Sequence, residues 1–296
     1  MTIKLYGGIE AGGTKFVCAV GSGPQNIVDE IRFPTTTPSE TIQKVCDFFT
    51  PHIHQLHGIG LGSFGPVDVN PESPTYGYIT TTPKPHWGNT NILGMIREKI
   101  KLPISIDMDV AIAGLGESKW GASRGLRHSL YLTIGTGIGG GFIMDGKPLR
   151  GLVSPEMGHI RIPHDFELDP FRGVCPYHGD CFEGLACGPS IQARFNQRAE
   201  TLADDHPFWD IEAGYIANAL VDCIFTLTPQ IIIIGGGVMQ KDFMFPKVRV
   251  RVRELINSYL THDLLLNNID KYIVPPMLEN RSGLLGGIAL AMEMDS

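Results

Sequence analysis

Short apolar runs alternate along the chain with segments in which apolar residues recur every three or four positions. The short runs are typical of buried strands and the periodic segments of helices. The predicted strands are 3–10, 16–20, 28–33, 58–63, 104–107, 129–134, 141–144 and 231–234. The predicted helices start near Ser39 and Ser190 or cover 111–120, 212–227, 247–260 and 283–292. This alternation predicts an α/β protein.

Glycine-rich segments follow three of these strands. Residues 11–15 and 135–140 each join two predicted strands, and 235–237 follows the strand 231–234. Because the two halves open alike, we predict duplicated domains facing across a cleft, 1–120 and 121–296, with the last helix packing back on the first. The loops 71–91 and 163–184 are long and rich in Gly, Pro, Thr and Asp, and loops of that length are often functional.

Composition excludes several classes of protein. The 43% hydrophobic and 19% charged residues are ordinary for a globular chain, and 24 Lys plus Arg against 31 Asp plus Glu give a net charge of −7. This acidity, without a basic block, disfavours binding to nucleic acid or to an anionic membrane. The longest strongly apolar stretch, 231–234, is too short to span a bilayer, and the N-terminus shows no signal-peptide pattern. Six unevenly spaced cysteines favour a reducing, cytoplasmic compartment.

The glycine turns are candidates for phosphate binding. Glycine lets backbone N–H groups approach an anion closely, and threonine adds a hydroxyl donor. Each turn alone is typical of a plain hairpin, and none matches a phosphate loop or a dinucleotide fingerprint. Three such turns in one chain favour a nucleotide.

Two cysteines and two histidines have the spacing of a metal site. Cys175, His178 and Cys181 form C-x-x-H-x-x-C, and His159 lies 16 residues before Cys175. Four nitrogen and sulfur ligands favour a closed tetrahedral zinc site that holds a loop. Taken one at a time, each cysteine could instead be a buried free thiol and each histidine a surface side chain.

Asp107 and Asp109 lie where a predicted strand ends and a helix begins, which is the usual ligand-facing edge of an α/β sheet. One carboxylate there can accept a proton from a hydroxyl during phosphoryl transfer. The reaction needs only one such carboxylate, so we expect only one of the two side chains to face the ligand. Either could instead cap the following helix.

These motifs together resemble the ROK family of sugar kinases, and most closely its bacterial fructokinase branch. The resemblance rests on the segments 10–15, 135–141, 156–159 and 235–238, on Asp109 and on the Cys/His cluster. It implies an actin-like (ribonuclease H-like) duplicated fold with ATP between the domains. The implied reaction is transfer of the γ-phosphoryl group of Mg-ATP to a hexose, converting D-fructose to D-fructose 6-phosphate. A homodimer is also implied.

The resemblance assigns roles to individual residues. Asp109 is the expected general base, and Glu10 is expected to orient water on Mg²⁺. The expected zinc ligands are His159, Cys175, His178 and Cys181, where His178 replaces a cysteine of the usual pattern. The expected ATP contacts are Gly12, Gly13, Thr14, Lys15, Thr133, Gly135, Thr136, Gly137, Pro189, Gly235, Gly236 and Gly237. The expected sugar contacts are Trp87, Glu156 and Glu183. Zinc is expected to hold the sugar loop, with the ATP turns distant from it.

Other interpretations stay open at this point. Trp87 could be a packed loop anchor, and the two glutamates could be solvated acids. Met108 and Ala111 stand where the family often has Asn, which argues against glucose-like sugar contacts. Mannose and glucose are the alternative substrates. A sugar-responsive regulator of the same family would be expected to carry a DNA-binding segment before the first strand, and a chaperone-type ATPase would lack 156–159 and the zinc ligands. A zinc-finger interaction module fits poorly with so long a chain.

Overall fold

The computed structural model describes residues 3–295 of the chain. These residues form two compact α/β units, one comprising 3–127, 141–155 and 277–295 and the other His128–Gly140 and Glu156–Pro276. The chain therefore passes between the units four times. The sequence analysis expected one boundary near residue 120 and the return of the last helix to the first domain, and it did not expect 141–155 in the first unit. No helix among residues 3–295 has the length and apolar character needed to cross a membrane.

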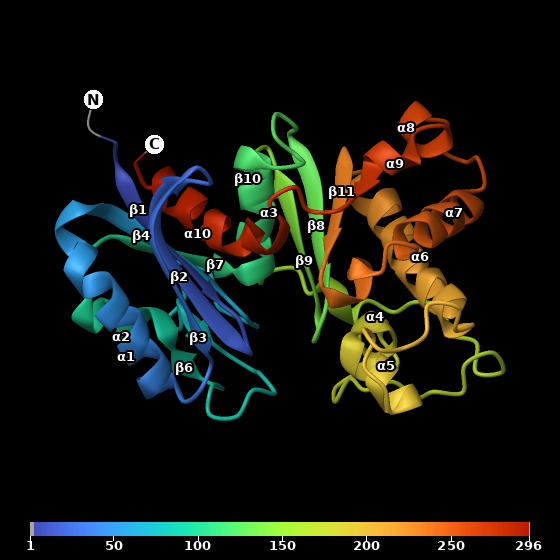
Figure 1. Ribbon diagram of the computed structural model, residues 1–296, viewed down its shortest axis with the longest axis horizontal. Helices are drawn as coiled ribbons and strands as arrows, with labels where there is room; N and C mark the ends of the chain where they lie inside the picture. Colours follow the sequence, from blue (N-terminus) through green and yellow to red (C-terminus); the bar gives the residue numbers. More distant parts are fainter. Residues whose placement is uncertain (1–2, 296) are drawn as a thin grey trace. The chain divides into compact units, whose positions relative to one another are not determined.

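The first sheet has the strand order β3-β2-β1-β4-β7 (Figure 1). Its members are β1 (Leu5–Ala11), β2 (Lys15–Gly23), β3 (Asn26–Pro34), β4 (Leu56–Ser63) and β7 (Ile104–Met108). Strands β1, β2 and β3 pair antiparallel, and β4 and β7 continue the sheet in parallel. The carboxyl ends of β1, β4 and β7 therefore meet at one edge, where β7 leads directly into α3 (Asp109–Trp120).

Helices cover both faces of this sheet. Helix α1 (Pro38–Phe49) packs beside α2 (Ile92–Lys99), and α10 (Ser282–Glu293) packs against α3, β1 and β4. Adjacent glycines of β1 show the two faces: a Cβ on Gly7 would strike Phe49 of α1, whereas one on Gly8 would strike the backbone of α10 at Leu284. Glycine at position 8 thus lets α10 lie directly on the strand.

The second sheet has the matching order β10-β9-β8-β11-β12. Its members are β8 (His128–Ile134), β9 (Ile138–Met144), β10 (Lys147–Pro148), β11 (Ile231–Gly235) and β12 (Ile273–Val274). Strand β11 pairs in parallel with β8 and β12, and all five of its residues are buried. Each sheet begins with a hairpin, β1–β2 in the first and β8–β9 in the second, and a later strand lies beside the first strand of that hairpin. This repeated order is the duplication expected from the two glycine turns.

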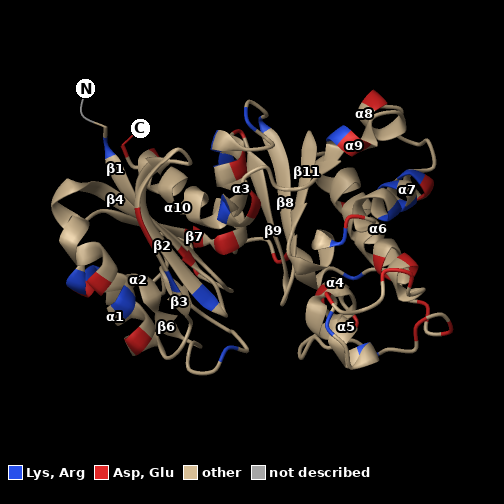
Figure 2. Cartoon of the chain, viewed as in Figure 1, with Lys and Arg blue, Asp and Glu red and all other residues tan. Residues whose placement is uncertain are grey.

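Helices of the second unit include α6 (Phe208–Leu227), which packs on α7 (Met244–Ile256). Helix α7 buries one apolar stripe, comprising Met244, Val248, Val252 and Ile256. Its basic residues give the blue band along this helix in Figure 2. The remaining helices are α4 (Phe182–Ala186), α5 (Gly188–Phe195), α8 (Asp263–Leu266) and α9 (Ile269–Tyr272).

Most predicted elements are present, with shifted ends. The N-cap of helix α1 is Thr37, two residues before the expected cap Ser39, and its side chain accepts a hydrogen bond from the Glu40 N–H. The sequence analysis missed α2, α4, α8, α9 and the short strands β5 (Tyr78–Ile79), β6 (Thr90–Asn91), β10 and β12. Each has at most eight residues, so it shows too little periodicity to stand out. The 3-10 turns are Thr50–Gln55, Met157–His159, Gly237–Gln240 and Glu279–Arg281.

Candidate active site

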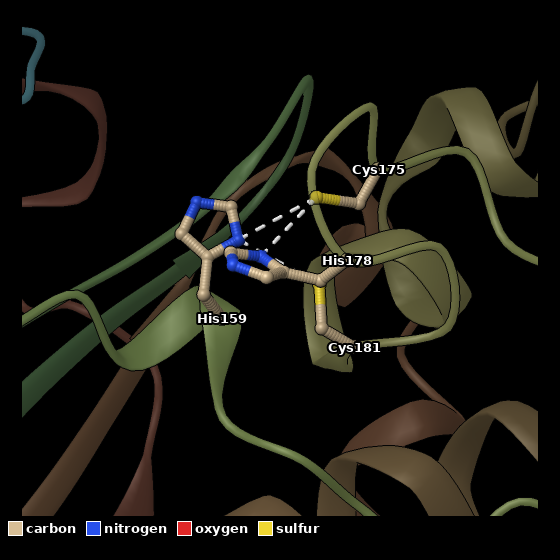
Figure 3. A group of neighbouring side chains, drawn as sticks. All are labelled: His159, Cys175, His178 and Cys181. Carbon is tan, nitrogen blue, oxygen red and sulfur yellow. Dashed lines mark hydrogen bonds between the residues drawn. The ribbon is translucent and has the colours of Figure 1, made fainter. Parts of the chain in front are cut away.

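The four predicted metal ligands come together in the second unit. Their ligand atoms all lie within 4.8 Å of one another. In Figure 3 the imidazole of His159 and the thiol of Cys175 point toward each other and toward His178. The Nδ1 of His159 lies 3.7 Å from the Sγ of Cys175 and 3.6 Å from that of Cys181, and the Nδ1 of His178 lies 3.6 Å from Cys175 Sγ.

These distances fit a tetrahedral zinc ion. Zinc bonds of about 2.3 Å to sulfur and about 2.0–2.1 Å to nitrogen place neighbouring S and N ligand atoms about 3.6 Å apart. A shared ion also explains why one imidazole nitrogen lies close to two sulfurs, which a single N–H could not satisfy with two good hydrogen bonds. The donor set of two cysteines and two histidines is therefore suited to structural zinc.

Backbone bonds hold the zinc segment in its fold. Cys175 and Gly179 form a reciprocal pair, in which the Gly179 N–H donates to the Cys175 carbonyl at 2.9 Å. Gly179 has φ +62°, and a Cβ on Gly173 or Gly184 would lie within 2.0 Å of its carbonyl oxygen. The Phe182 N–H donates to the Ile160 carbonyl at 3.0 Å, which joins the two halves of the ligand set.

A pocket of about 370 Å³ lies next to the second glycine turn, within the size range of small-molecule sites. Gly135, Thr136, Pro189 and Gly237, all predicted ATP contacts, line it. The other predicted contacts of this unit, Thr133, Gly137, Gly235 and Gly236, are not among its lining residues. Gly188, which precedes Pro189 in the helix start expected at the nucleotide site, also lines the pocket. Sequence reasoning missed the other lining residues, Gln192, Arg198, Ala199, Glu200 and Val238.

The third glycine turn has two different kinds of glycine. Gly236 has φ +94°, and a Cβ there would lie 2.3 Å from the Ile134 carbonyl oxygen of β8. A Cβ on Gly237 would have its nearest neighbour, the Glu200 carboxylate, at 3.8 Å. The backbone conformation at position 236 thus requires glycine. At position 237 the absence of a side chain leaves open space beside Glu200, which lines the pocket.

Gly237→Val is therefore expected to weaken ATP binding at least about tenfold with little loss of stability, because its methyl groups extend into open pocket space. Titration calorimetry with a non-hydrolysable ATP analogue measures this. Gly236→Ala is the contrasting variant. Because its Cβ would meet the Ile134 backbone, it should lower the thermal unfolding midpoint, whereas Gly237→Val should lower ATP affinity. An unchanged analogue Kd in a folded Gly237→Val protein would remove this turn from the nucleotide site.

The first glycine turn joins β1 to β2 in the first unit. The Gly12 N–H donates to the Lys15 carbonyl at 3.0 Å, and the Thr35 hydroxyl donates to the Gly12 carbonyl at 2.7 Å. Gly13 lies between them, half-buried, and Thr14 and Lys15 are exposed at the tip. The turn thus presents a hydroxyl and an ammonium group to solvent, as phosphate binding requires.

Glu10 is the next-to-last residue of β1 and lies beside the N-terminus of α10. Its carboxyl group accepts a backbone hydrogen bond from Leu284, and a Cβ on Gly283 would lie 2.7 Å from its Cδ. Desolvation raises the pKa of Glu10, although Lys15 and Arg32 favour its charged form. The role of Glu10 toward Mg²⁺ stays a prediction.

Asp107 and Asp109 have different environments at the end of β7. The Asp107 side chain is 1% exposed and receives hydrogen bonds from Arg150 Nε at 2.9 Å and from the Met108 N–H at 2.8 Å. Asp109 is half-buried at the first position of α3, where it accepts from the Val110 N–H at 2.8 Å. Asp107 is thus committed to a structural ion pair, which leaves Asp109 as the candidate base. No local pattern in the sequence pointed to Arg150.

Arg150→Met is expected to destabilise the first unit at neutral pH. Burial already raises the pKa of Asp107 in the folded state, and Arg150 opposes that effect. Without Arg150 a buried carboxylate loses its cation, which we expect to lower the unfolding free energy by about 2 kcal/mol after allowing for the partly exposed guanidinium. A raised carboxyl pKa lowers stability as pH rises through it, so the defect should shrink toward pH 4. Denaturant titrations at pH 4.5 and 7.5 measure this, and an equal defect at both values would contradict it.

Trp87 requires a correction. Its side chain is fully buried, its indole N–H donates to the Thr36 carbonyl at 2.8 Å, and its ring packs against Phe16 and Phe64. The ring therefore has no open face for a sugar. The alternative interpretation, a packed anchor of the 71–91 loop, fits the structure, and we do not retain Trp87 as a sugar contact.

Glu156 and Glu183 lie close enough to interact. Although much of the Glu156 residue is exposed, desolvation of its carboxyl group and the negative charge of Glu183 raise its pKa to about 7. The Glu183 Oε2 atom accepts a hydrogen bond from the Ile138 N–H at 2.8 Å. Glu183 thus contacts the second glycine turn, which the sequence analysis did not expect.

Comparison with known proteins identifies the relatives of the chain. The sequence model of the ROK family matches residues 6–294. A fructokinase of Lactococcus lactis is 44% identical over 98% of this chain and 97% of its own length. A fructokinase of Streptococcus mutans is also 44% identical, over 98% of each chain.

A solved ROK hexokinase of Thermus thermophilus superposes with a TM-score of 0.80 at 23% identity, covering 98% of this chain and 99% of that one. This similarity of fold, with the two matching sheets, confirms the predicted duplicated, actin-like architecture of sugar kinases.

Proposed function

This chain belongs to the ROK family, and we propose that it transfers the γ-phosphoryl group of ATP to the 6-hydroxyl of D-fructose. It is a hexose kinase of the fructokinase type. The observation that carries the choice of sugar is the 44% identity to fructokinases over nearly the whole chain. Mannose and glucose remain the alternative substrates within the same family.

Phosphoryl transfer depends on positioning and on neutralising the charge of the phosphates. We assign these tasks to the backbone N–H groups and hydroxyls of the glycine turns, to the Lys15 ammonium group and to the pocket lined by Gly135 and Gly237. Mg²⁺ bound with ATP would supply further neutralisation. Asp109 would accept the proton of the attacking hydroxyl. The assignment is supported by the ion pair that occupies Asp107.

Sugar recognition falls to Glu156 in this proposal, because a carboxylate accepts hydrogen bonds from sugar hydroxyls. Glu156 lies three residues before His159, and the His159 N–H donates to the Glu156 carbonyl at 3.0 Å. Zinc held by His159, Cys175, His178 and Cys181 would fix this segment without taking part in the reaction. Homodimer formation and a cytoplasmic location stay predictions.

A panel of hexoses in a coupled ADP assay tests the function. We expect fructose to give the highest kcat/KM, and the product to be fructose 6-phosphate by its conversion with phosphoglucose isomerase. Preference for glucose or mannose would reassign the substrate within the family. ATP turnover that is independent of sugar would contradict a sugar kinase altogether.

A further inference from the structure

The zinc segment and the second glycine turn are directly connected. Glu183 lies two residues after the ligand Cys181, and its Oε2 accepts from the Ile138 N–H at 2.8 Å. Five residues later, the Gly188 N–H donates to the Gly135 carbonyl at 2.8 Å. The stretch 183–188 therefore binds the turn 135–138 at both of its ends.

Glycine at position 137 makes this contact sterically possible. A Cβ on Gly137 would lie 2.7 Å from the Glu183 Oε2 atom, so a larger residue would displace the carboxylate. Within the turn, the Gly135 N–H donates to the Gly137 carbonyl at 2.9 Å. The carboxylate thus adds a hydrogen bond from outside the turn to the one that joins Gly135 and Gly137.

The stretch 183–188 is also hydrogen-bonded to residues outside the glycine turn. The Arg194 side chain is 4% exposed, and it donates to the Leu185 carbonyl at 2.7 Å and to Asp169 Oδ2 at 2.8 Å. Tyr215 of α6 donates to the same Asp169 oxygen at 2.7 Å. Helix α4, which carries Glu183, is therefore anchored to the zinc loop and to α6 and cannot shift freely with the turn.

We propose that Glu183 is a positioning residue for the nucleotide pocket: its carboxylate holds the Gly135–Gly137 turn in the shape that binds the phosphates. Gly135 and Thr136 of this turn line the pocket beside Gly188 and Pro189. The inference rests on the proposed function for the identity of the nucleotide. It adds that nucleotide affinity depends on Glu183 even when no sugar is present.

Two substitutions at one position separate this role from a sugar contact. In Glu183→Gln the amide oxygen can still accept from the Ile138 N–H, whereas Glu183→Ala has no acceptor. We expect Glu183→Ala to bind a magnesium complex of a non-hydrolysable ATP analogue about tenfold more weakly without sugar. Glu183→Gln should bind within about threefold of the wild type, because a neutral acceptor still makes the bond. Glu167→Ala, an exposed glutamate of the same loop, should bind like the wild type.

Calorimetric titration of the four proteins gives the answer. Equal analogue affinity in Glu183→Ala and the wild type would overturn the proposal and leave only a sugar contact. If Glu183→Ala fails to fold, hydrogen exchange of the wild type replaces it. In protein without nucleotide, we expect the Ile138 N–H to exchange as slowly as the backbone N–H groups of β8. Rapid exchange of the Ile138 N–H would overturn the proposal. If wild-type protein binds no nucleotide, the proposed function fails instead.

Discussion

Asp109→Asn is expected to lower kcat at least about 100-fold, because a positioned general base contributes typically 10² to 10⁴ to the rate. The amide keeps the size of the side chain and can still accept from the Val110 N–H, so the start of α3 should be unchanged. The KM for sugar and the Kd for ATP should stay within about threefold, because the lost interaction acts mainly in the transition state. Steady-state kinetics with fructose and ATP, together with an analogue titration, measure both quantities.

Asp107→Asn is the matched comparison for this experiment. Asp107 lies two residues before Asp109 and is the charge partner of Arg150. The main effect of removing its charge should therefore be on stability, with a smaller loss of kcat. If Asp109→Asn retains nearly full kcat while Asp107→Asn loses it, the assignment of the base would be reversed. The thermal midpoint of each variant distinguishes loss of structure from loss of chemistry.

Sequence patterns predicted the fold well where they were long or repeated. The two hairpins with their glycine turns, the buried strand that became β11 and the long helix that became α6 were all recognisable. The sequence also grouped the candidate metal ligands that the structure brings within 4.8 Å of one another, because C-x-x-H-x-x-C is a local spacing. The fourth candidate ligand, His159, lies only 16 residues before Cys175.

Contacts between distant segments could not be read in the same way. Arg150 reaches Asp107 across 43 positions, and the Glu183 carboxylate reaches the Ile138 N–H across 45. Neither pair has a local spacing, so only the folded chain shows it. Trp87 illustrates the opposite error: an aromatic residue in a polar loop suggested a ligand face, but packing against Phe16 and Phe64 buried it.

We expect the wild-type protein to carry one zinc per chain and Cys181→Ser to lose most of it. A serine hydroxyl is a poor substitute for a thiolate, and the remaining three ligands leave the tetrahedral site open. Because metal binding free energy becomes folding free energy at such a site, we expect the unfolding free energy of the second unit to fall by at least about 3 kcal/mol. Elemental analysis and denaturant titration measure the two effects. Cys223→Ser, which changes a buried thiol of α6 outside the cluster, should retain its zinc.

Ligand binding by Cys181→Ser tests how far the metal acts. Sequence alone suggested that the ATP turns are distant from the zinc loop, which would leave ATP affinity unchanged. The hydrogen bonds from Ile138 to Glu183 and from Gly188 to Gly135 join the two regions instead. We therefore expect weaker binding of both fructose and the ATP analogue, with the stronger effect on fructose because Glu156 precedes the ligand His159. Wild-type protein without zinc, or a zinc-free variant that binds both ligands normally, would show that the cluster does not hold this loop.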